Sequence, residues 1–412
     1  MRILFVAPQV PFPPDKGTKI RNLGLITTLA RDHEVGLIAL SDRPDAPLAA
    51  ELARTCTYTR VVATPTPRGV RRRVVDLLRD NRPDLALRLY TPALRSAIRD
   101  ATVRGAWDIV QFEGLETAHQ GIGAVSPGAS VVYDAHNAEW RLQARAATSD
   151  ARQGRVIGAL YSMIQASRLR RAEGAIATSA SGVVVVSRED AASIRAVGSP
   201  RHLHIVPNGV DTEALRERLG QGDDGRYLFT GTMDYRPNID GVVWFARHVW
   251  PEIKRRDPSA VFDVVGRSPV RTVRDLERVA GIVVHGETPT TRPFFERARA
   301  VVVPLLVGGG ARLKVLEAFA HGVPVVSTSL GIEGINALDG THFVAADTPR
   351  AFADAVVRLN GDTEFRARLR TAARDLVATQ YDWRAIVPGI QDFYRICIMG
   401  MLNSPGNITS EA

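Results

Sequence analysis

Three charged residues follow a run of glycines and could together bind an anionic ligand that carries hydroxyl groups. Arg312 and Lys314 come two and four residues after the last of the glycines at 308–310, and Glu317 lies about one helical turn after Lys314. Glycine lets a backbone approach a ligand closely, and the free amides of a helix beginning here favour negative charge. Cations in a first helical turn oppose the helix dipole unless an anion joins them. Alternatively, Glu317 pairs with Lys314 or these residues form a solvated face.

A second candidate is His136, in the sequence Asp-Ala-His-Asn that follows an apolar run. That run predicts a buried strand, and ligands of parallel sheets bind beyond the carboxyl ends of the strands. No serine or cysteine lies beside His136 to form a nucleophile triad, so its role would be hydrogen bonding or polarisation. The alternative is a histidine satisfied by hydrogen bonds at a helix start.

A third candidate is the proline-rich loop after the first apolar run, which ends in Gly17 and Thr18 before a helical pattern. A rigid loop that ends at a helix N-terminus can bind an anion, although proline and glycine also simply form loops. The chain lacks the G-x-G-x-x-G and G-x-x-x-x-G-K-[ST] fingerprints, which disfavours nicotinamide dinucleotides and P-loop chemistry. It also lacks Asp-x-Asp, so we expect no metal-bridged diphosphate site and no bound metal.

The elements that position these residues are short apolar runs alternating with helical patterns. Runs at 2–7, 35–40, 60–63, 108–112, 131–134, 182–187 and 204–207 predict one set of parallel strands, and runs at 227–231, 261–266, 282–285, 300–304 and 323–327 predict another. Helices are expected near 20–31, 239–256 and 311–320, and the tail over 351–402 reads as helical. The polar, glycine-rich stretch up to residue 225 is the best linker.

The expected fold class is therefore α/β, with two doubly wound Rossmann-like domains facing a cleft. We expect an N-terminal domain at 1–207 and a C-terminal domain at 208–383. A C-terminal helix at 384–402 should pack back on the first domain, because its large apolar stripe must be covered. Residues 403–412 are expected to be a tail.

Composition bounds the class of protein. The 412 residues are 45% hydrophobic and 24% charged, which is ordinary for a globular chain, and two distant cysteines exclude a disulfide framework. Only four of the 53 basic residues are lysine, which is typical of a GC-rich genome, and the net charge is +9. We expect a cytoplasmic protein without a leader peptide or a membrane-spanning helix.

The positive charge could bind nucleic acid, an anionic membrane or phosphorylated substrates, or could simply form solvated helix faces. No aromatic residues are interleaved for base stacking, so we favour an anionic substrate or a peripheral membrane contact over nucleic acid. Much of the charge falls in two clusters: Arg68, Arg71, Arg72, Arg73 and Arg79, and Arg141, Arg145, Arg152, Arg155, Arg168, Arg170 and Arg171.

Three segments resemble glycosyltransferase family 4, whose members are retaining enzymes of the GT-B fold. They are the glycine loop with R-L-K-V-L-E-A-F-A-H-G-V-P-V-V-S, the sequence I-V-P-N-G-V-D, and G-T-M-D-Y-R-P-N. The resemblance covers nearly the whole chain. It implies a nucleotide-sugar donor, with UDP or GDP expected first, bound by the C-terminal domain at 208–383. It also implies a glycan, lipid-linked or small-molecule acceptor bound by the N-terminal domain at 1–207. It implies no metal and no cofactor.

The resemblance also implies roles for single residues. The family has a motif of two glutamates separated by seven residues. Glu317 matches the second glutamate and is expected to hold the donor ribose. His136 matches a histidine that in the family lies near the donor sugar and phosphate. The first glutamate falls on Gly309, so the backbone amides of Gly309, Gly310 and Ala311 are expected to replace it. The donor site is also expected to include Gly17, Thr18, Gly231 and Leu313.

The family's diphosphate-binding arginine and lysine fall on Thr232 and Pro237. We therefore assign that work to Arg312 and Lys314, with Arg236 as a further candidate. Catalysis would then rest on positioning and charge stabilisation, because the diphosphate leaving group itself can take the acceptor's proton. Two other readings stay open: a GT-B nucleotide-sugar epimerase, and a catalytically inactive GT-B subunit that binds a partner.

Overall fold

The computed structural model describes residues 1–46, 49–215, 225–307 and 312–402 of the chain. These residues divide into two compact units, each with its own sheet. The first unit consists of Met1–Pro207 with the described residues from Ile386 on, and the second is Asn208–Ala385. The second unit thus ends two residues later than the 208–383 expected from sequence.

The first unit is built on a seven-stranded parallel sheet with the order β3-β2-β1-β4-β5-β6-β7. Its central strands are apolar along almost their whole length because helices cover both faces. The strands are β1 (Arg2–Ala7), β2 (Glu34–Ser41), β3 (Tyr58–Ala63), β4 (Ile109–Glu113), β5 (Ser130–Ala135), β6 (Gly182–Val185) and β7 (Leu203–Ile205).

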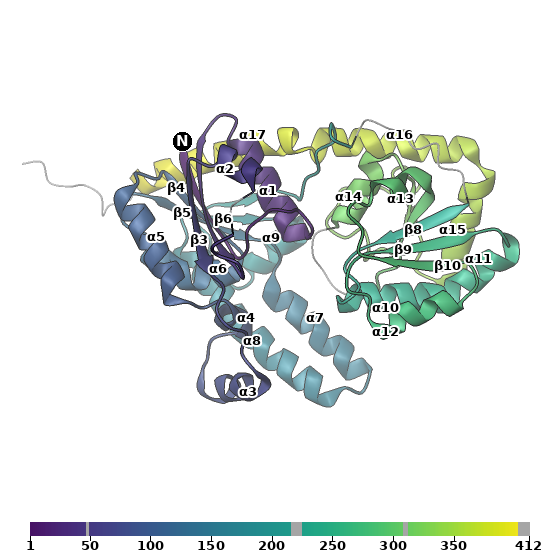
Figure 1. Ribbon diagram of the computed structural model, residues 1–412, viewed down its shortest axis with the longest axis horizontal. Helices are drawn as coiled ribbons and strands as arrows, with labels where there is room; N and C mark the ends of the chain where they lie inside the picture. The colour runs from purple at the N-terminus through teal and green to yellow at the C-terminus, as the bar shows by residue number, and fades with distance from the viewer. Residues whose placement is uncertain (47–48, 216–224, 308–311, 403–412) are drawn as a thin grey trace, which may run out of the picture. The chain divides into compact units, whose positions relative to one another are not determined.

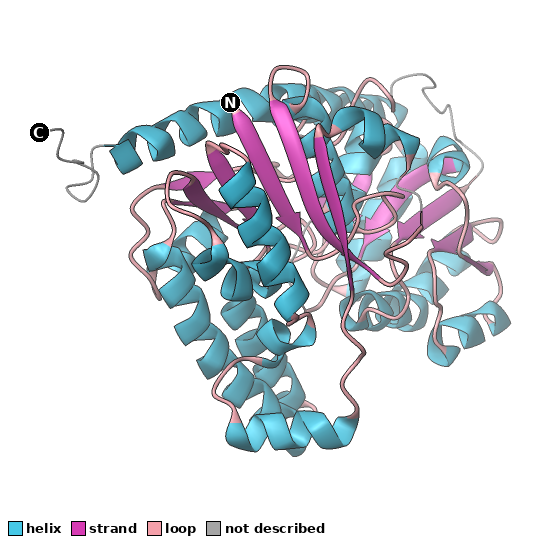
Figure 2. Cartoon of the chain, turned by 60° about the vertical axis from the view of Figure 1, so that its left-hand side comes forward, coloured by secondary structure: helices cyan, strands magenta, loops and turns pink. Residues whose placement is uncertain are grey.

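Helices lie on both sides of this sheet (Figure 2). On one face Phe112 of β4 packs against Gly121 and Ile98, in a core of buried aliphatic side chains. The helices are α1 (Gly17–Leu29), α2 (Ala50–Thr55), α3 (Val70–Arg79), α4 (Asp84–Arg88), α5 (Pro92–Arg104), α6 (Leu115–Gly121), η1 (Ile122–Ala124), α7 (Glu139–Arg152), α8 (Val156–Ser179), α9 (Arg188–Arg195) and α17 (Trp383–Leu402).

The C-terminal helix α17 packs on the other face of the first sheet. A side chain at Gly182 of β6 would collide with Phe393 and Cys397 of α17, so this glycine allows a close approach. The Tyr394 hydroxyl donates a hydrogen bond to Gln111 of β4, and Ser130 donates one to the Cys397 carbonyl (3.2 Å). The apolar stripe of the tail is therefore covered by this sheet.

The second unit has a six-stranded parallel sheet with the order β10-β9-β8-β11-β12-β13 (Figure 1). Its strands are β8 (Arg226–Thr230), β9 (Val261–Val265), β10 (Ile282–Gly286), β11 (Ala298–Val303), β12 (Val325–Ser327) and β13 (Val344–Ala345). Its helices are α10 (Arg236–Trp244), η2 (Phe245–Val249), α11 (Trp250–Arg256), α12 (Arg271–Arg274), η3 (Asp275–Arg278), α13 (Arg292–Arg297), α14 (Leu313–Ala320), α15 (Pro349–Gly361) and α16 (Thr363–Gln380).

The prediction of two doubly wound α/β domains is confirmed, and the differences are local. The single helix expected over 239–256 begins earlier, at Arg236, and is divided by the π-helical turn η2. Pro251 has no amide hydrogen for the carbonyl one turn earlier, which explains the division. The helix expected over 311–320 begins at Leu313, which makes Arg312 its N-cap residue. The C-terminal helix begins at Trp383, one residue before the expected start.

Candidate functional site

His136 lies just beyond β5 and is held by a carboxylate at the end of the neighbouring strand β4. Its Nε2 is 2.7 Å from Oε2 of Glu113, whose side chain is fully buried. Burial by itself lowers the pKa of His136, but the hydrogen bond to Glu113 and the charges of Asp134 and Glu113 outweigh it, so the pKa is raised. The ring therefore holds a proton more readily than a free histidine and can stabilise a nearby anion.

A chain of hydrogen bonds connects this histidine to the C-terminal helix. Gln111 donates from Nε2 to Oε1 of Glu113 (2.7 Å) and accepts from the hydroxyl of Tyr394. The amide of Asn22, in the orientation that satisfies its neighbours, donates to Oε2 of Glu113 (2.8 Å). Because Gln111 and Glu113 alternate with Phe112 along β4, they share the face that α17 covers. This network fixes the position of Glu113 and, through it, of the His136 ring.

Arg21 of α1 balances the second buried carboxylate of this cluster. Its Nε and Nη2 donate to Oδ2 of Asp134 (3.1 and 2.8 Å), and its Nη1 donates to the carbonyls of Val206 and Pro207. Burial raises the pKa of Asp134, and the arginine counters that shift. Oxygen and nitrogen atoms of Glu113, Asp134 and His136 lie within 4.8 Å of one another, a spacing that a metal ion could use. Arg21 and His136 already supply positive charge there.

The proline-rich loop brings Gly17 and Thr18 to the first turn of α1. The Thr18 hydroxyl accepts a hydrogen bond from Gln9 (3.1 Å), which ties the loop to the helix. Lys19 pairs with Asp15 (2.9 Å) and donates to the Pro13 carbonyl. Asp15 of the preceding loop therefore already neutralises this lysine, and the first turn of α1 offers a ligand mainly its backbone amides.

In the second unit, Lys314 lies in the first turn of α14 beside the end of β8. Its ammonium donates to Oδ1 of Asn238 (3.0 Å) and stands 3.8 Å from the ring centroid of Phe229. A side chain at Gly231 would come within 3.0 Å of that ammonium, so the glycine leaves room beside it. Burial, reinforced by the charge of Arg312, lowers the pKa of Lys314 to about 7. An anion bound here would restore full protonation.

Glu317 is one turn further along α14. Burial raises its pKa to about 7, and Lys314 opposes that shift. Within the described residues its carboxylate accepts no hydrogen bond and forms no ion pair with Lys314. The alternative of an i to i+3 pair on α14 is therefore not what the structure shows, and the carboxylate is available to accept bonds from a ligand.

Arg312 and Arg236 are more engaged than their assignment to the diphosphate anticipates. The buried Arg312 guanidinium donates from Nη2 to the Leu330 carbonyl (2.7 Å) and lies 3.9 Å from Glu333. Arg236 pairs with Asp240 one turn on (3.4 Å). Of the three cations assigned to the diphosphate, Lys314 has no acidic partner within the described part of the chain. It is therefore the strongest of the three candidates for that work.

The remaining expected donor residues divide into two groups. Leu313 opens α14 and is buried. Gly309, Gly310 and Ala311 lie outside the described residues, so the expectation that their amides bind the donor stays a prediction.

Sequence reasoning missed several residues that hold the two sites. Glu113 ends a buried strand with a carboxylate, and that position alone could have marked it. Asn238 directly follows Pro237 in a segment already singled out. Phe229 and Tyr394 gave no local signal, because each reads as an ordinary apolar position.

Two known protein families match the chain, one over most of each unit. The family described as "Glycosyltransferase Family 4" matches residues 17–214, and the family described as "Glycosyl transferases group 1" matches residues 224–362. Each model covers one of the two units that carry the candidate sites. The two parallel-sheet units have the architecture of the GT-B fold, and the chain belongs to the family 4, group 1 type of glycosyltransferases.

Two curated relatives match part of the chain. An uncharacterized 44.6 kDa protein in the cps region of Klebsiella pneumoniae is 24% identical over 171 residues, which are 40% of this chain and 44% of the relative. The alpha-D-kanosaminyltransferase of Streptomyces kanamyceticus is 28% identical over 203 residues, 45% of this chain and 50% of the relative. The chain thus spans about half the length of the curated relatives it matches.

Solved structures share the fold across the chain. Sucrose-phosphate synthase from Thermosynechococcus elongatus has a TM-score of 0.73 at 18% identity, covering 96% of this chain and 98% of its own. Anabaena HepE in complex with UDP and glucose has a TM-score of 0.65 at 14% identity, covering 96% and 99%. WaaG, a glycosyltransferase involved in lipopolysaccharide biosynthesis, has a TM-score of 0.61 at 15% identity, covering 95% and 99%. Among the described residues, none of the helices is long and apolar enough to cross a bilayer.

Proposed function

We propose that the protein is a retaining glycosyltransferase that moves a hexosyl group from a nucleotide-sugar donor to a hydroxyl of a glycan, lipid-linked or small-molecule acceptor. The environment of Lys314 is the observation that supports a nucleotide-sugar donor. Its ammonium is partly buried, its pKa is lowered to about 7, and it has no acidic partner among the described residues. Such a group gains most from an anion, and a diphosphate supplies one.

In this proposal the second unit binds the donor. Lys314 meets the negative charge that develops on the diphosphate as the glycosidic bond breaks, and Glu317 accepts hydrogen bonds from the ribose hydroxyls. Arg312 holds the start of α14 through the Leu330 carbonyl, and so positions Lys314. UDP is the first donor base to test, because the structures of HepE contain UDP or UDP-glucose.

The first unit binds the acceptor. His136, whose pKa is raised by its bond to Glu113, is assigned to donate to an oxygen of the donor sugar or the phosphate, as the family resemblance implies. Cations and amides supply the charge stabilisation, so the proposal contains no metal ion. We place the enzyme in the cytoplasm of a bacterium, at the inner face of the membrane when the acceptor is lipid-linked, in polysaccharide or glycoconjugate synthesis.

Incubation with nucleotide sugars and no acceptor tests the reaction type. A transferase hydrolyses the donor slowly at most, an epimerase converts its sugar, and an inactive binding subunit does neither. A thermal-shift screen with UDP, GDP, ADP, dTDP and their sugars identifies the base, since a ligand at 100 times its dissociation constant adds about 2.7 kcal/mol to stability. If no nucleotide stabilises the protein, the donor assignment is wrong.

A further inference from the structure

Helix α3 is amphipathic, but its apolar side chains face away from the protein. None of its ten residues is buried. Val70, Val74 and Leu78 repeat every four residues along one stripe of the helix, and they are 77%, 51% and 79% exposed. An ordinary surface helix of a globular protein turns such a stripe toward the core. In Figure 1, α3 lies at the periphery of the first unit, beyond α4 and α8.

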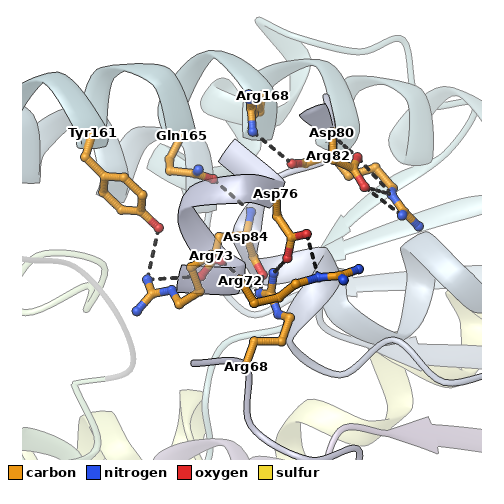
Figure 3. Close-up of polar contacts among 10 residues, drawn as sticks. All are labelled: Arg68, Arg72, Arg73, Asp76, Asp80, Arg82, Asp84, Tyr161, Gln165 and Arg168. Carbon is orange, nitrogen blue, oxygen red and sulfur yellow. Dashed lines mark hydrogen bonds and ion pairs between the residues drawn. The ribbon is translucent and has the colours of Figure 1, made fainter. Parts of the chain in front are cut away.

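The polar side of α3 is the side that contacts the protein, as Figure 3 shows. Asp76 pairs with Arg68 (2.8 Å), and Arg73 contacts both Asp84 (3.3 Å) and the hydroxyl of Tyr161 in α8 (3.1 Å). Arg168 of α8 donates to the Leu77 carbonyl (2.6 Å). Charged hydrogen bonds, rather than apolar burial, therefore fix this helix with its apolar stripe outward.

These contacts leave only some arginines of the two clusters available for the anionic substrate or membrane contact that the sequence favoured. Arg68, Arg73 and Arg168 are used inside the protein, and Arg155 pairs with Asp150 (3.3 Å). Arg71 and Arg79 differ, because no acidic partner meets them in the described part of the chain, and Arg72 is 71% exposed despite its contact with Asp76. Within the first cluster, the cations that remain available are Arg71, Arg72 and Arg79, which belong to α3 and flank its apolar stripe.

A second exposed apolar stripe lies at the start of α8. Val156, Ile157, Leu160 and Met163 are 74%, 88%, 59% and 62% exposed. Leu160 directly precedes Tyr161, the residue that Arg73 contacts, so the two helices are linked at this point. Apolar side chains flanked by arginines are the composition of a helix that lies in the interface of a bilayer.

We propose that α3 and the start of α8 dock on an anionic lipid bilayer, with Val70, Val74 and Leu78 entering the acyl boundary and Arg71 and Arg79 contacting lipid phosphates. A second copy of this chain fits less well, because its arginines would repel those of the first. Helix α3 follows β3 in the chain and His136 follows β5, so both come after the carboxyl ends of parallel strands in the same sheet. Docking would therefore present the carboxyl ends of these strands, where His136 lies, toward the membrane surface.

The inference rests on the proposed function only for its biological role, since lipid binding is measurable without a donor. Sedimentation of the full chain with vesicles of phosphatidylcholine, with or without about one quarter phosphatidylglycerol, should show binding to the anionic vesicles that weakens as salt is raised. The double variant Val74→Asp with Leu78→Asp should bind at least about tenfold more weakly. Because both positions are exposed, the variant should fold like the wild type.

The matched control is Val103→Asp in α5, which is 70% exposed and shortly precedes the amino end of β4, away from α3 in the chain. It should bind vesicles like the wild type. Arg71→Glu with Arg79→Glu should weaken binding and flatten its salt dependence, each arginine contributing about fivefold at low salt. Equal vesicle binding by wild type and the Val74, Leu78 variant would overturn the proposal, and so would absence of wild-type binding. Concentration-dependent dimerisation that this variant abolishes would assign the face to a second copy. The thermal shift with UDP reports separately on the proposed function.

Discussion

The pH dependence of donor affinity offers a direct test of the roles given to Lys314 and Glu317. The pKa of the Lys314 ammonium is lowered to about 7 and the pKa of the Glu317 carboxyl is raised to about 7. At such a pKa about 90% of the lysine is protonated at pH 6 and about 10% at pH 8, and the ionised fraction of the glutamate changes in the opposite sense. The form with both charges is therefore most populated near pH 7.

If the diphosphate needs the ammonium and the ribose needs the carboxylate, wild-type affinity for UDP-glucose should pass through a maximum near pH 7. Lys314→Met should leave only the glutamate, so that affinity rises by about tenfold from pH 6 to pH 8. Glu317→Gln should leave only the lysine, so that affinity falls by about tenfold over the same range. In the wild type each charge favours the charged form of the other residue. The rise in Lys314→Met should therefore lie at higher pH, and the fall in Glu317→Gln at lower pH, than the pKa values of the wild type suggest.

Isothermal titration calorimetry in buffers of different ionisation enthalpy measures both affinity and protons exchanged. At pH 7 the Glu317→Gln variant should take up about half a proton on binding, and Lys314→Met should release about half. Lys314→Met should also lower kcat by about 100-fold to 1,000-fold, the scale of a lost oxyanion donor. Lys254→Met, whose ammonium contacts the carbonyls of Pro258 and Ala260, is the control and should keep the wild-type profile. A wild-type pH profile in Lys314→Met would refute the reasoning.

Three further perturbations test the positions of the two sites. Glu113→Gln should lower the pKa of His136 in an NMR titration. In the wild type the raised pKa stabilises the fold below pH 6.5, and this stabilisation is lost as the pH rises through the pKa of the folded state, so the variant should lose about 1 to 3 kcal/mol more unfolding free energy at pH 5 than at pH 9. A loss that does not depend on pH would contradict the pairing of Glu113 with His136. Tyr394→Phe removes the bond to Gln111 and should cost about 1 kcal/mol in urea unfolding, whereas Tyr90→Phe at a partly exposed ring should cost nothing measurable. Gly266→Ala places a methyl group 1.7 Å from the Gly231 carbonyl oxygen, so it should destabilise the protein by about 3 kcal/mol and abolish nucleotide binding. Gly361→Ala, whose methyl group would meet open space, is the control and should be tolerated. Unchanged nucleotide affinity in Gly266→Ala would show that this contact does not support the donor site.

Much of the fold is written in local patterns of the sequence. Near-continuous apolar runs separated by helical patterns predicted two parallel sheets, because a strand covered on both faces has no polar side to reveal. The strand expected at 2–7 is β1 itself, and the others differ by a few residues at their ends. The segment around Lys314 and Glu317 was also readable, since glycines, a helix start and charges lie within ten residues of one another.

The tertiary structure alone decided which side chains meet. His136 and Glu113 are 23 residues apart, Lys314 and Asn238 are 76 apart, and Tyr394 and Gln111 are 283 apart. Parallel strands need long crossover connections, so their neighbouring ends carry no common signal in the sequence. The direction in which α3 faces was equally hidden, because an amphipathic pattern is the same whichever side turns inward. Charged contacts choose the side, and the partners Asp84, Tyr161 and Arg168 come from other helices.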